Sequence, residues 1–437
     1  MANADLARVA IGLNFSRSRV YRIRPVRPLP DGHRCERSHR VVDADNPPRR
    51  RWFVLVLAVV VLVAAAVIAL VGGTGGDGRD DAARSSGAPA SSASTVPARP
   101  DLPRRTGITF GSALYRLPAA SVRAALDDVR RLHMSWIRVD LSWTEVQPVS
   151  PDRFDWRKLD LVVREAATRK LSVLGLLTYT PGWARAAGCR GGFVCPPRSA
   201  AEFADFASAA VERYAGRGIT TYQLWNEPDL DQFWTSPDPD AYGRLVAAAV
   251  PAMRAATSRT LTVLTGGLGY AGTDTAARAR GDVDAGRFLA RACALSRCRV
   301  DAVGYDPATY PNLPSAETDP ANAWQLLSRS APGRTALRAA MAGVGLGDKQ
   351  VWITGFGAPT TYPGATSGRV VSERVQGQIL LDGLRLAGRA RASVGAFFVD
   401  TLRDTAARGT FRDHFGLLRS DDTRKPAYGV LQSELAR

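Results

Sequence analysis

Histidine and cysteine are scarce in this chain, which has four His and five Cys in 437 residues. No two cysteines have the spacing of a CxxC pair, and the two residue types form no zinc-finger pattern. The sequence therefore predicts neither a metal centre nor any other cofactor.

Four of the cysteines form two close pairs along the chain, Cys189 with Cys195 and Cys293 with Cys298, whereas Cys35 stands alone. An even number of cysteines is typical of disulfides in a protein exported to an oxidising compartment. Four cysteines allow three pairings, and we predict the local one, in which each bridge closes a small loop. Metal ligation by these cysteines is the alternative.

Features of nucleic-acid-binding proteins are also missing. The net charge is +17, but basic residues are not interleaved with aromatic ones as in nucleic-acid-binding surfaces. We therefore interpret the charge as a solvated basic surface and predict no nucleic-acid partner.

One hydrophobic run is long enough to cross a membrane. Residues 52–71 carry no charge, and twenty such residues span the ~30 Å hydrocarbon layer as a helix. Arg49, Arg50 and Arg51 precede the run, so the positive-inside rule places the N-terminus in the cytoplasm. The alternative, a cleaved signal peptide, fits less well with the length of the run and with the tail that precedes it.

The run divides the chain into segments of different composition. Residues 1–51 contain 12 Arg and 5 acidic residues and are predicted to be a disordered cytoplasmic tail. Residues 72–104 are small, polar and interrupted by proline, which predicts a flexible linker. Residues 105–437 are predicted to be an extracellular domain, held at the cell membrane by the single helix.

Short β-rich apolar runs alternate with helix-like segments from residue 105 onward, which predicts a parallel sheet covered by helices. The longest helix-like segment is 320–342. Eight repeats in about 330 residues fit a closed (β/α)₈ barrel. An open doubly wound sheet is the alternative, but Gly111-Ser112-Ala113 does not form the glycine-rich phosphate loop that such a sheet usually has. The eight runs are 107–112, 136–141, 172–177, 221–225, 261–266, 302–305, 350–354 and 395–399.

Active sites of such barrels lie at the carboxyl ends of the strands. Polar and aromatic residues gather at these predicted ends: Arg138, Asp140, Trp143, Tyr179, Trp183, Asn226, Glu227, Asp306, Tyr310, Asp400 and Asp404.

Trp225-Asn226-Glu227-Pro228 is the most specific motif among these residues. With it, the chain resembles glycoside hydrolase clan A, in its xylosidase/iduronidase-like and cellulase-like branches, over about residues 107–432. The resemblance implies that Glu227 is the acid/base of a retaining site and that Asn226 binds the sugar 2-hydroxyl. It implies that Arg138 lies beneath the nucleophile. Candidate sugar contacts are Trp143, Trp183, Trp234 and Tyr310, although core packing is an equal alternative for each tryptophan.

Three positions depart from the clan pattern. Gly355 stands where the resemblance expects the nucleophilic Glu, so the nucleophile position is vacant. Asp306-Pro307-Ala308 replaces a common His-Pro-Tyr, and Phe397-Phe398-Val399 replaces a segment that often contains Trp. Asp306 or Asp140 could act instead as the base of an inverting reaction, but we favour the interpretation that Asp306 neutralises Arg138.

The sequence leaves three functions open. The first is a membrane-anchored protein that binds an extracellular oligo- or polysaccharide but hydrolyses it weakly or not at all. The second is an active O-glycosyl hydrolase with a displaced catalytic partner. The third is a non-catalytic cell-surface protein whose cleft is unused.

Overall fold

The computed structural model describes residues 101–270, 279–317, 322–365 and 370–437. The predicted tail, membrane span and most of the linker lie outside these residues. Within the described ranges, none of the helices combines the length and the apolar character that crossing a bilayer requires.

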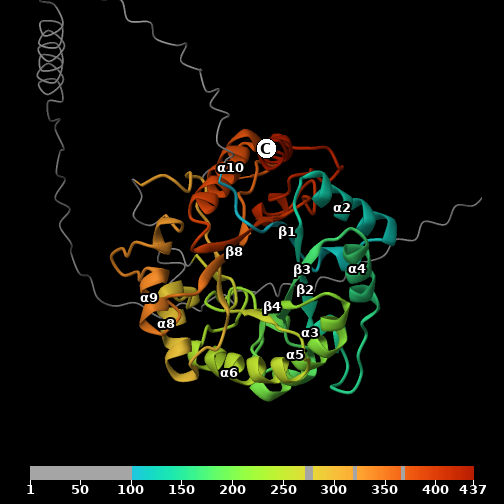
Figure 1. The fold of residues 1–437 in the computed structure, drawn as a ribbon, viewed down its shortest axis with the longest axis vertical. Coiled ribbons are helices and arrows are strands. Elements are labelled where there is room, and N and C mark those ends of the chain that lie inside the picture. The colour runs from blue at the N-terminus through green and yellow to red at the C-terminus, as the bar shows by residue number, and fades with distance from the viewer. Residues whose placement is uncertain (1–100, 271–278, 318–321, 366–369) are drawn as a thin grey trace, which may run out of the picture. The chain divides into compact units, whose positions relative to one another are not determined.

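Eight parallel strands form a closed barrel, as the strand–helix alternation predicts (Figure 1). Sequence neighbours pair in order, and the Leu264–Ala302 pair closes the ring between β5 and β7. A short ninth strand, β6, extends along β7. The strands are β1 (Thr106–Gly111), β2 (Trp136–Ser142), β3 (Ser172–Thr178), β4 (Thr221–Leu224), β5 (Thr262–Leu264), β6 (Leu268–Gly269), β7 (Ala302–Asp306), β8 (Gln350–Phe356) and β9 (Val394–Asp400).

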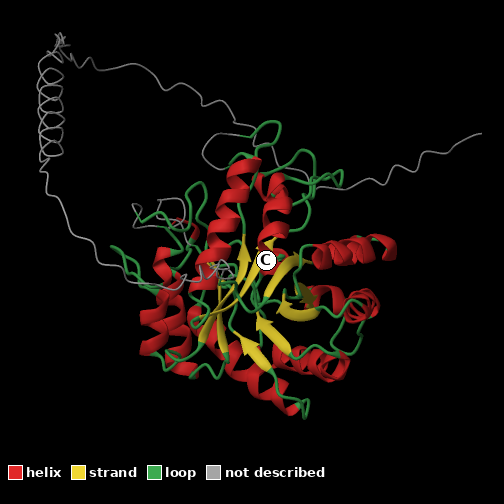
Figure 2. Ribbon diagram, turned by 45° about the horizontal axis from the view of Figure 1, so that its top comes forward, coloured by secondary structure: helices red, strands yellow, loops and turns green. Residues whose placement is uncertain are grey.

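Helices surround the barrel on its outer side (Figure 2). Side-chain caps begin several of them, because Ser199, Asp238, Asp284 and Ser372 each accept a hydrogen bond from a backbone N–H of the first turn. The α-helices are α2 (Ala119–Arg131), α3 (Trp143–Val146), α4 (Arg157–Thr168), α5 (Ala200–Tyr214), α6 (Pro239–Ala255), α8 (Ala285–Ser296), α9 (Leu337–Gly343), α10 (Glu373–Arg389) and α11 (Pro426–Leu435).

One predicted helix is wrong in extent. Within the described part of this segment, residues 322–342, only those from Leu337 onward form an α-helix. Pro332-Gly333 interrupts it, and Gly333 has φ 74°, a left-handed conformation that favours glycine. The Ala331–Arg334 bridge closes the resulting turn. Helix α11, at the C-terminus, was not predicted.

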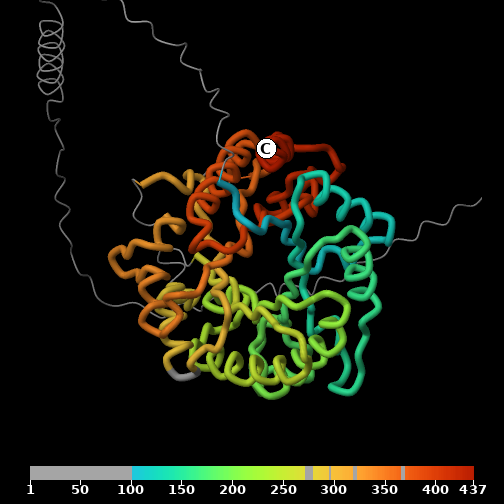
Figure 3. Tube along the Cα trace, in the orientation of Figure 1, coloured from blue at the N-terminus to red at the C-terminus, as the bar shows by residue number. Residues whose placement is uncertain are grey.

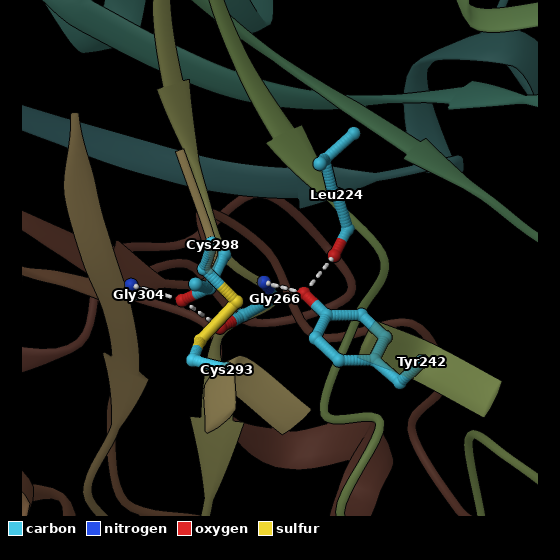
Figure 4. The surroundings of a disulfide bond; sticks show 7 residues. Leu224, Tyr242, Gly266, Cys293, Cys298 and Gly304 are labelled. Atoms are coloured by element: carbon cyan, nitrogen blue, oxygen red, sulfur yellow. Dashed lines mark hydrogen bonds between the residues drawn. A yellow bond between two sulfur atoms is a disulfide. The ribbon is translucent and has the colours of Figure 1, made fainter. Parts of the chain in front are cut away.

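Both predicted disulfides are confirmed, as Cys189–Cys195 and Cys293–Cys298. The second joins the end of α8 to the segment that leads into β7, beside a set of hydrogen bonds that joins α6 to the barrel (Figure 4). There the Tyr242 hydroxyl donates to the carbonyl oxygen of Leu224 at 2.9 Å and accepts from the backbone N–H of Gly266 at 2.6 Å. These bonds fix the end of β4, from which the site residues follow.

The first and last strands, β1 and β9, pair side by side, so segments far apart in the sequence meet in the barrel (Figure 3). A buried ion pair holds the segment after β9. The Lys425 ammonium, 1% exposed, donates to Asp404 Oδ1 at 2.8 Å, to Thr360 Oγ1 at 2.9 Å and to the His414 carbonyl oxygen at 3.2 Å. Burial lowers the pKa of Lys425, and the hydrogen bond to Asp404 opposes that shift.

We predict that Asp404→Ala lowers the free energy of unfolding by about 3–5 kcal/mol, because it leaves a buried ammonium without its carboxylate. Denaturant titration measures the loss. The control is Asp421→Ala, which removes a carboxylate of an exposed turn and should cost less than about 1 kcal/mol. Equal losses in the two variants would contradict the assigned role of the pair.

Candidate active site

A cavity of about 470 Å³ opens at the carboxyl ends of the strands, where the sequence predicts the site. Its wall contains six of the predicted site residues: Arg138, Asn226, Glu227, Asp306, Tyr310 and Gly355. Asp140, Tyr179 and Asp400 also line it. The structure therefore brings the ends of β4, β7 and β8 to one pocket.

Arg138, on β2, forms the floor of this pocket and is 3% exposed. Its Nε donates to Gln223 Oε1 at 2.7 Å, and its Nη2 donates to Asn226 Oδ1 at 2.8 Å. Within the described ranges, no carboxylate lies within 4.0 Å of its guanidinium, so Arg138 is held by amides. Because the Asn226 oxygen is engaged in this way, the amide can offer a ligand its N–H donors.

The network continues across the barrel to β8. Gln223 Nε2 donates to Thr354 Oγ1 at 3.1 Å, and Thr109 Oγ1 donates to the Thr354 carbonyl oxygen at 2.7 Å. The Thr354 hydroxyl in turn donates to Asp306 Oδ1 at 2.5 Å. Side chains of β2, β4 and β8 therefore fix the carboxylate at the end of β7.

Glu227 follows β4 in a strained backbone. Trp225 and Glu227 have φ values of 73° and 39°, in the left-handed region, and such strain costs about 1–3 kcal/mol per residue. The Glu227 backbone N–H donates to the Gly267 carbonyl oxygen at 3.0 Å. Burial raises the pKa of the Glu227 carboxyl well above its usual value, and the negative charges of Asp306 and Asp229 raise it further, against Arg138. This carboxyl is thus suited to remain protonated near neutral pH.

Gly355 and Asp306 are direct neighbours. A Cβ built on Gly355 would lie 3.2 Å from Asp306 Oδ2 and 3.3 Å from its Cγ. The carboxylate of Asp306 therefore stands against the bare backbone of Gly355, the position at which the sequence resemblance expects a nucleophile. Asp306 accepts from the Thr354 hydroxyl and forms no direct ion pair with Arg138 among the described residues. Burial raises the pKa of Asp306 and the charge of Arg138 opposes that rise. The interpretation that Asp306 neutralises Arg138 stays a prediction.

Two further carboxyls face the same floor. Asp140 accepts from the Ser112 hydroxyl at 2.7 Å, and burial raises its pKa. Burial also raises the pKa of Asp400 to about 6, which Arg138 opposes. The charge of Arg138 opposes the raised pKa values of four buried carboxyls, Glu227, Asp306, Asp140 and Asp400. One cation serves four carboxyls, so the site favours keeping some of them protonated at neutral pH.

The predicted tryptophan platforms are not part of the pocket. Trp143 and Trp234 are 0% and 1% exposed and pack in the core. Trp183 is half-buried, packs edge-on against Trp143 at 5.5 Å and donates its indole N–H to the Gln147 carbonyl oxygen at 2.8 Å. These positions are corrected to core packing.

Loops supply the residues that sequence reasoning missed. Gln232 Nε2 donates to Glu227 Oε2 at 3.4 Å, and Arg412 donates to Gln232 Oε1. The loop after β9 is thus linked to Glu227 through Gln232. In the sequence, only the basic and aromatic character of residues 403–415 indicates that this loop lines the pocket. The other missed lining side chains include Tyr270, Arg403, Phe411 and Phe415.

Among the residues that the structure describes, no group of three or more His, Cys, Asp or Glu is arranged to hold a metal ion. The polar groups that line the pocket are carboxyls, side-chain amides, hydroxyls and guanidinium groups. Each of these groups can exchange hydrogen bonds with a polyhydroxylated ligand.

No protein-family model matches the chain, and no curated protein matches it. Solved structures are similar at low sequence identity. A family 39 glycoside hydrolase from Bacteroides cellulosilyticus is 18% identical with a TM-score of 0.55, over 77% of this chain and 64% of that one. A monomeric β-xylosidase from Caulobacter crescentus is 18% identical with a TM-score of 0.54, over 76% and 69%.

A GH5_18 structure from Streptomyces cattleya, in complex with Manβ1-4GlcNAc, is 17% identical with a TM-score of 0.56, over 76% of this chain and 80% of that one. The chain spans slightly less than two thirds of the Bacteroides structure. At these identities the likeness shows the fold alone, and the predicted (β/α)₈ barrel is confirmed.

We predict a pH-dependent effect of Asp400→Asn. The pKa of Asp400 is about 6 in the folded protein against a usual 3.8, so the folded state binds this proton more tightly. The stability contribution of Asp400 is then full below pH 3.8 and is lost as the pH rises through 6. The substitution should raise the free energy of unfolding near pH 8 by up to about 3 kcal/mol.

At about pH 3.5 the same variant should match the parent protein, and denaturant titration at the two pH values measures the difference. The control is Asp348→Asn, at an exposed carboxylate paired with Lys349, which should show no gain at either pH. A gain of equal size at both pH values would rule out the ionisation of Asp400 as its cause.

Proposed function

We propose that this protein is a glycoside-hydrolase-like barrel that binds an oligo- or polysaccharide in its pocket, with Glu227 as the retained acid/base. The observation that carries the proposal is the meeting of a desolvated Glu227 carboxyl with the vacant position Gly355 in one cavity. Hydrolysis by the retaining route is then weak or lost.

Chemical reasons support Glu227 as the proton donor. A general acid must carry its proton at the working pH, and burial together with neighbouring carboxylates raises its pKa to that end. Burial, Asp306 and Asp229 act on Glu227 in this sense. Beside it, Asn226 and Arg138 form a polar floor whose N–H groups can donate to sugar hydroxyls.

The retaining route fails at residue 355. Double displacement needs a second carboxylate ~5–5.5 Å from the first to form the glycosyl-enzyme, and glycine has no group to form that bond. The loss of a catalytic nucleophile costs several orders of magnitude in turnover. Binding can remain, because Asn226, Arg138 and Tyr310 still line the cavity.

The same proposal places the barrel outside the cell, anchored by residues 52–71 at the cell membrane. Two disulfides support an oxidising compartment. The apolar run behind three arginines supports the anchor and its orientation.

Binding of an oligosaccharide array, scored with the purified protein, tests the proposal. Asn226→Ala and Glu227→Gln should weaken binding of the same oligosaccharides at least about tenfold, since a lost buried hydrogen bond costs ~1–3 kcal/mol. The control is Gln432→Ala in α11, at a residue that binds the Arg131 carbonyl oxygen instead of lining the pocket. Binding that is unchanged in all three variants would leave the third function, a scaffold with an unused cleft.

We predict that Gly355→Glu alone gives no hydrolysis with retention. Its Cβ would lie 3.2 Å from Asp306 Oδ2, and two carboxylates would then compete for one place. The double variant Gly355→Glu/Asp306→Ala removes this conflict and should hydrolyse activated aryl β-glycosides with retention, at least about tenfold faster than Gly355→Glu. Release of nitrophenol and NMR of the first-formed sugar measure rate and configuration.

The single variant Asp306→Ala is the control for the effect of the freed space alone. It has no carboxylate at 306 or at 355 and should give no hydrolysis with retention. Full activity of the single variant Gly355→Glu would show that Asp306 does not obstruct the nucleophile position.

A further inference from the structure

We infer that Asp306 takes the place of the missing second carboxylate and acts as the base of a single-displacement, inverting hydrolysis, with Glu227 as the acid. The inference rests on the proposed function and assigns the turnover that survives at this site to a carboxylate from β7 instead of β8.

The first observation is the room that glycines leave for this carboxylate. A Cβ on Gly267 would lie 2.5 Å from Asp306 Oδ2 and 2.8 Å from its Cγ, and a Cβ on Gly355 would lie 3.2 Å from the same oxygen. A contact of 2.5 Å is impossible for a real side chain, so any larger residue at 267 would displace Asp306. The position of Asp306 therefore depends on small residues on both sides of it.

The second observation is how Asp306 is held. Its Oδ1 accepts from the Thr354 hydroxyl at 2.5 Å. Burial raises the pKa of Asp306, and the charge of Arg138, the Thr354 hydroxyl and the backbone N–H groups of Gly355 and Thr354 oppose that rise. Donors that stabilise the ionised form are what a general base requires. Asp306 is 9% exposed and lines the cavity, so its carboxylate remains in reach of a water there.

The third observation is that the two carboxyls face the same short segment. A Cβ on Gly269 would lie 3.1 Å from the Glu227 carboxyl carbon, and a Cβ on Gly267 would lie 2.8 Å from Asp306 Cγ. Residues two apart in an extended segment are separated by about 7 Å, so each carboxyl stands against its own glycine. Inverting enzymes need ~6.5–9.5 Å between their carboxyls to admit a water, and the inferred reaction requires this separation between Glu227 and Asp306.

These elements give a balanced reaction. The Asp306 carboxylate takes a proton from a water as the water oxygen bonds to the anomeric carbon. The glycosidic C–O bond breaks, and the Glu227 carboxylic acid gives its proton to the leaving oxygen. The products are a sugar of inverted configuration and an alcohol, with the proton now on Asp306. Proton exchange with solvent restores Glu227, so no further reactant is needed.

Asp140, the other candidate for a replacement base, is less well placed. It is bound by Ser112 and lies 3.7 Å from a Cβ on Gly111, between β1 and β2. Asp306, in contrast, contacts the vacant position itself. The negative charge of Asp306 also raises the pKa of Glu227, so the two groups divide the roles of acid and base.

The full chain is tested with 2,4-dinitrophenyl β-D-xyloside, β-D-glucoside and β-D-mannoside as probes. We expect turnover of at least one of them, with the α-anomer formed first in the proton NMR spectrum. Asp306→Asn should lower kcat by about 10²–10⁴-fold, the range for loss of a general base. Glu227→Gln should change it far less, because dinitrophenolate leaves without a proton.

With a poorer leaving group, methylumbelliferyl in place of dinitrophenyl, the effect of Glu227→Gln should grow whereas that of Asp306→Asn should persist. Azide should rescue Asp306→Asn and give an α-glycosyl azide. The matched control is Asp348→Asn, an exposed carboxylate, which should keep the parent rate. Thermal unfolding of each variant separates lost folding from lost chemistry.

Several outcomes overturn the inference and leave the proposed function standing. They are a β-anomer as first product, parental turnover in Asp306→Asn, loss of turnover in Asp140→Asn alone, or no turnover of any probe while the array still shows binding that depends on Asn226. If no oligosaccharide binds and no probe turns over, the proposed function fails with it.

Discussion

One buried guanidinium determines the character of this site. Arg138 lies beneath the pocket without a carboxylate in ion-pair distance among the described residues, and its hydrogen bonds go to the amides of Gln223 and Asn226. A buried charge needs compensation, and here four carboxyls share that role: Glu227, Asp306, Asp140 and Asp400. The charge of Arg138 acts on each of them from a distance in the direction that lowers its pKa. Because four carboxyls share one cation, the pocket favours a mixture of protonated and ionised groups at neutral pH.

The barrel could be predicted from the sequence because its signal is periodic. All eight apolar runs form strands, and parallel strands place their carboxyl ends at one rim. That rule alone brought Arg138, Asn226, Glu227, Asp306, Tyr310 and Gly355 to one cavity. The predicted helix over 320–342 is wrong in extent because the spacing of apolar residues favours a helix there, whereas Pro332-Gly333 favours a turn.

The site could be predicted only where strand ends determine it. Trp143 and Trp234 follow strands in the sequence, yet their rings turn into the core, since large aromatic side chains stabilise more by burial than by exposure. The contact of Arg412 with Gln232 joins loops 180 residues apart, and no local pattern encodes such a meeting. The hydrogen bond that the Thr354 hydroxyl donates to Asp306 likewise joins two different strands, and no local pattern encodes it.

The positions 355, 306 and 267 form one coupled set. A side chain at 355 meets the Asp306 carboxylate, and a side chain at 267 would occupy its place. Asp306 in turn keeps a negative charge near Glu227, which is the electrostatic effect that a nucleophile in the clan arrangement also has on its acid. In the mechanism we infer, the barrel therefore retains a pair of unlike carboxyls while the strand that supplies the second one changes. In that mechanism the second carboxylate comes from β7, beside the bare backbone at 355, and a water takes the place of the covalent nucleophile.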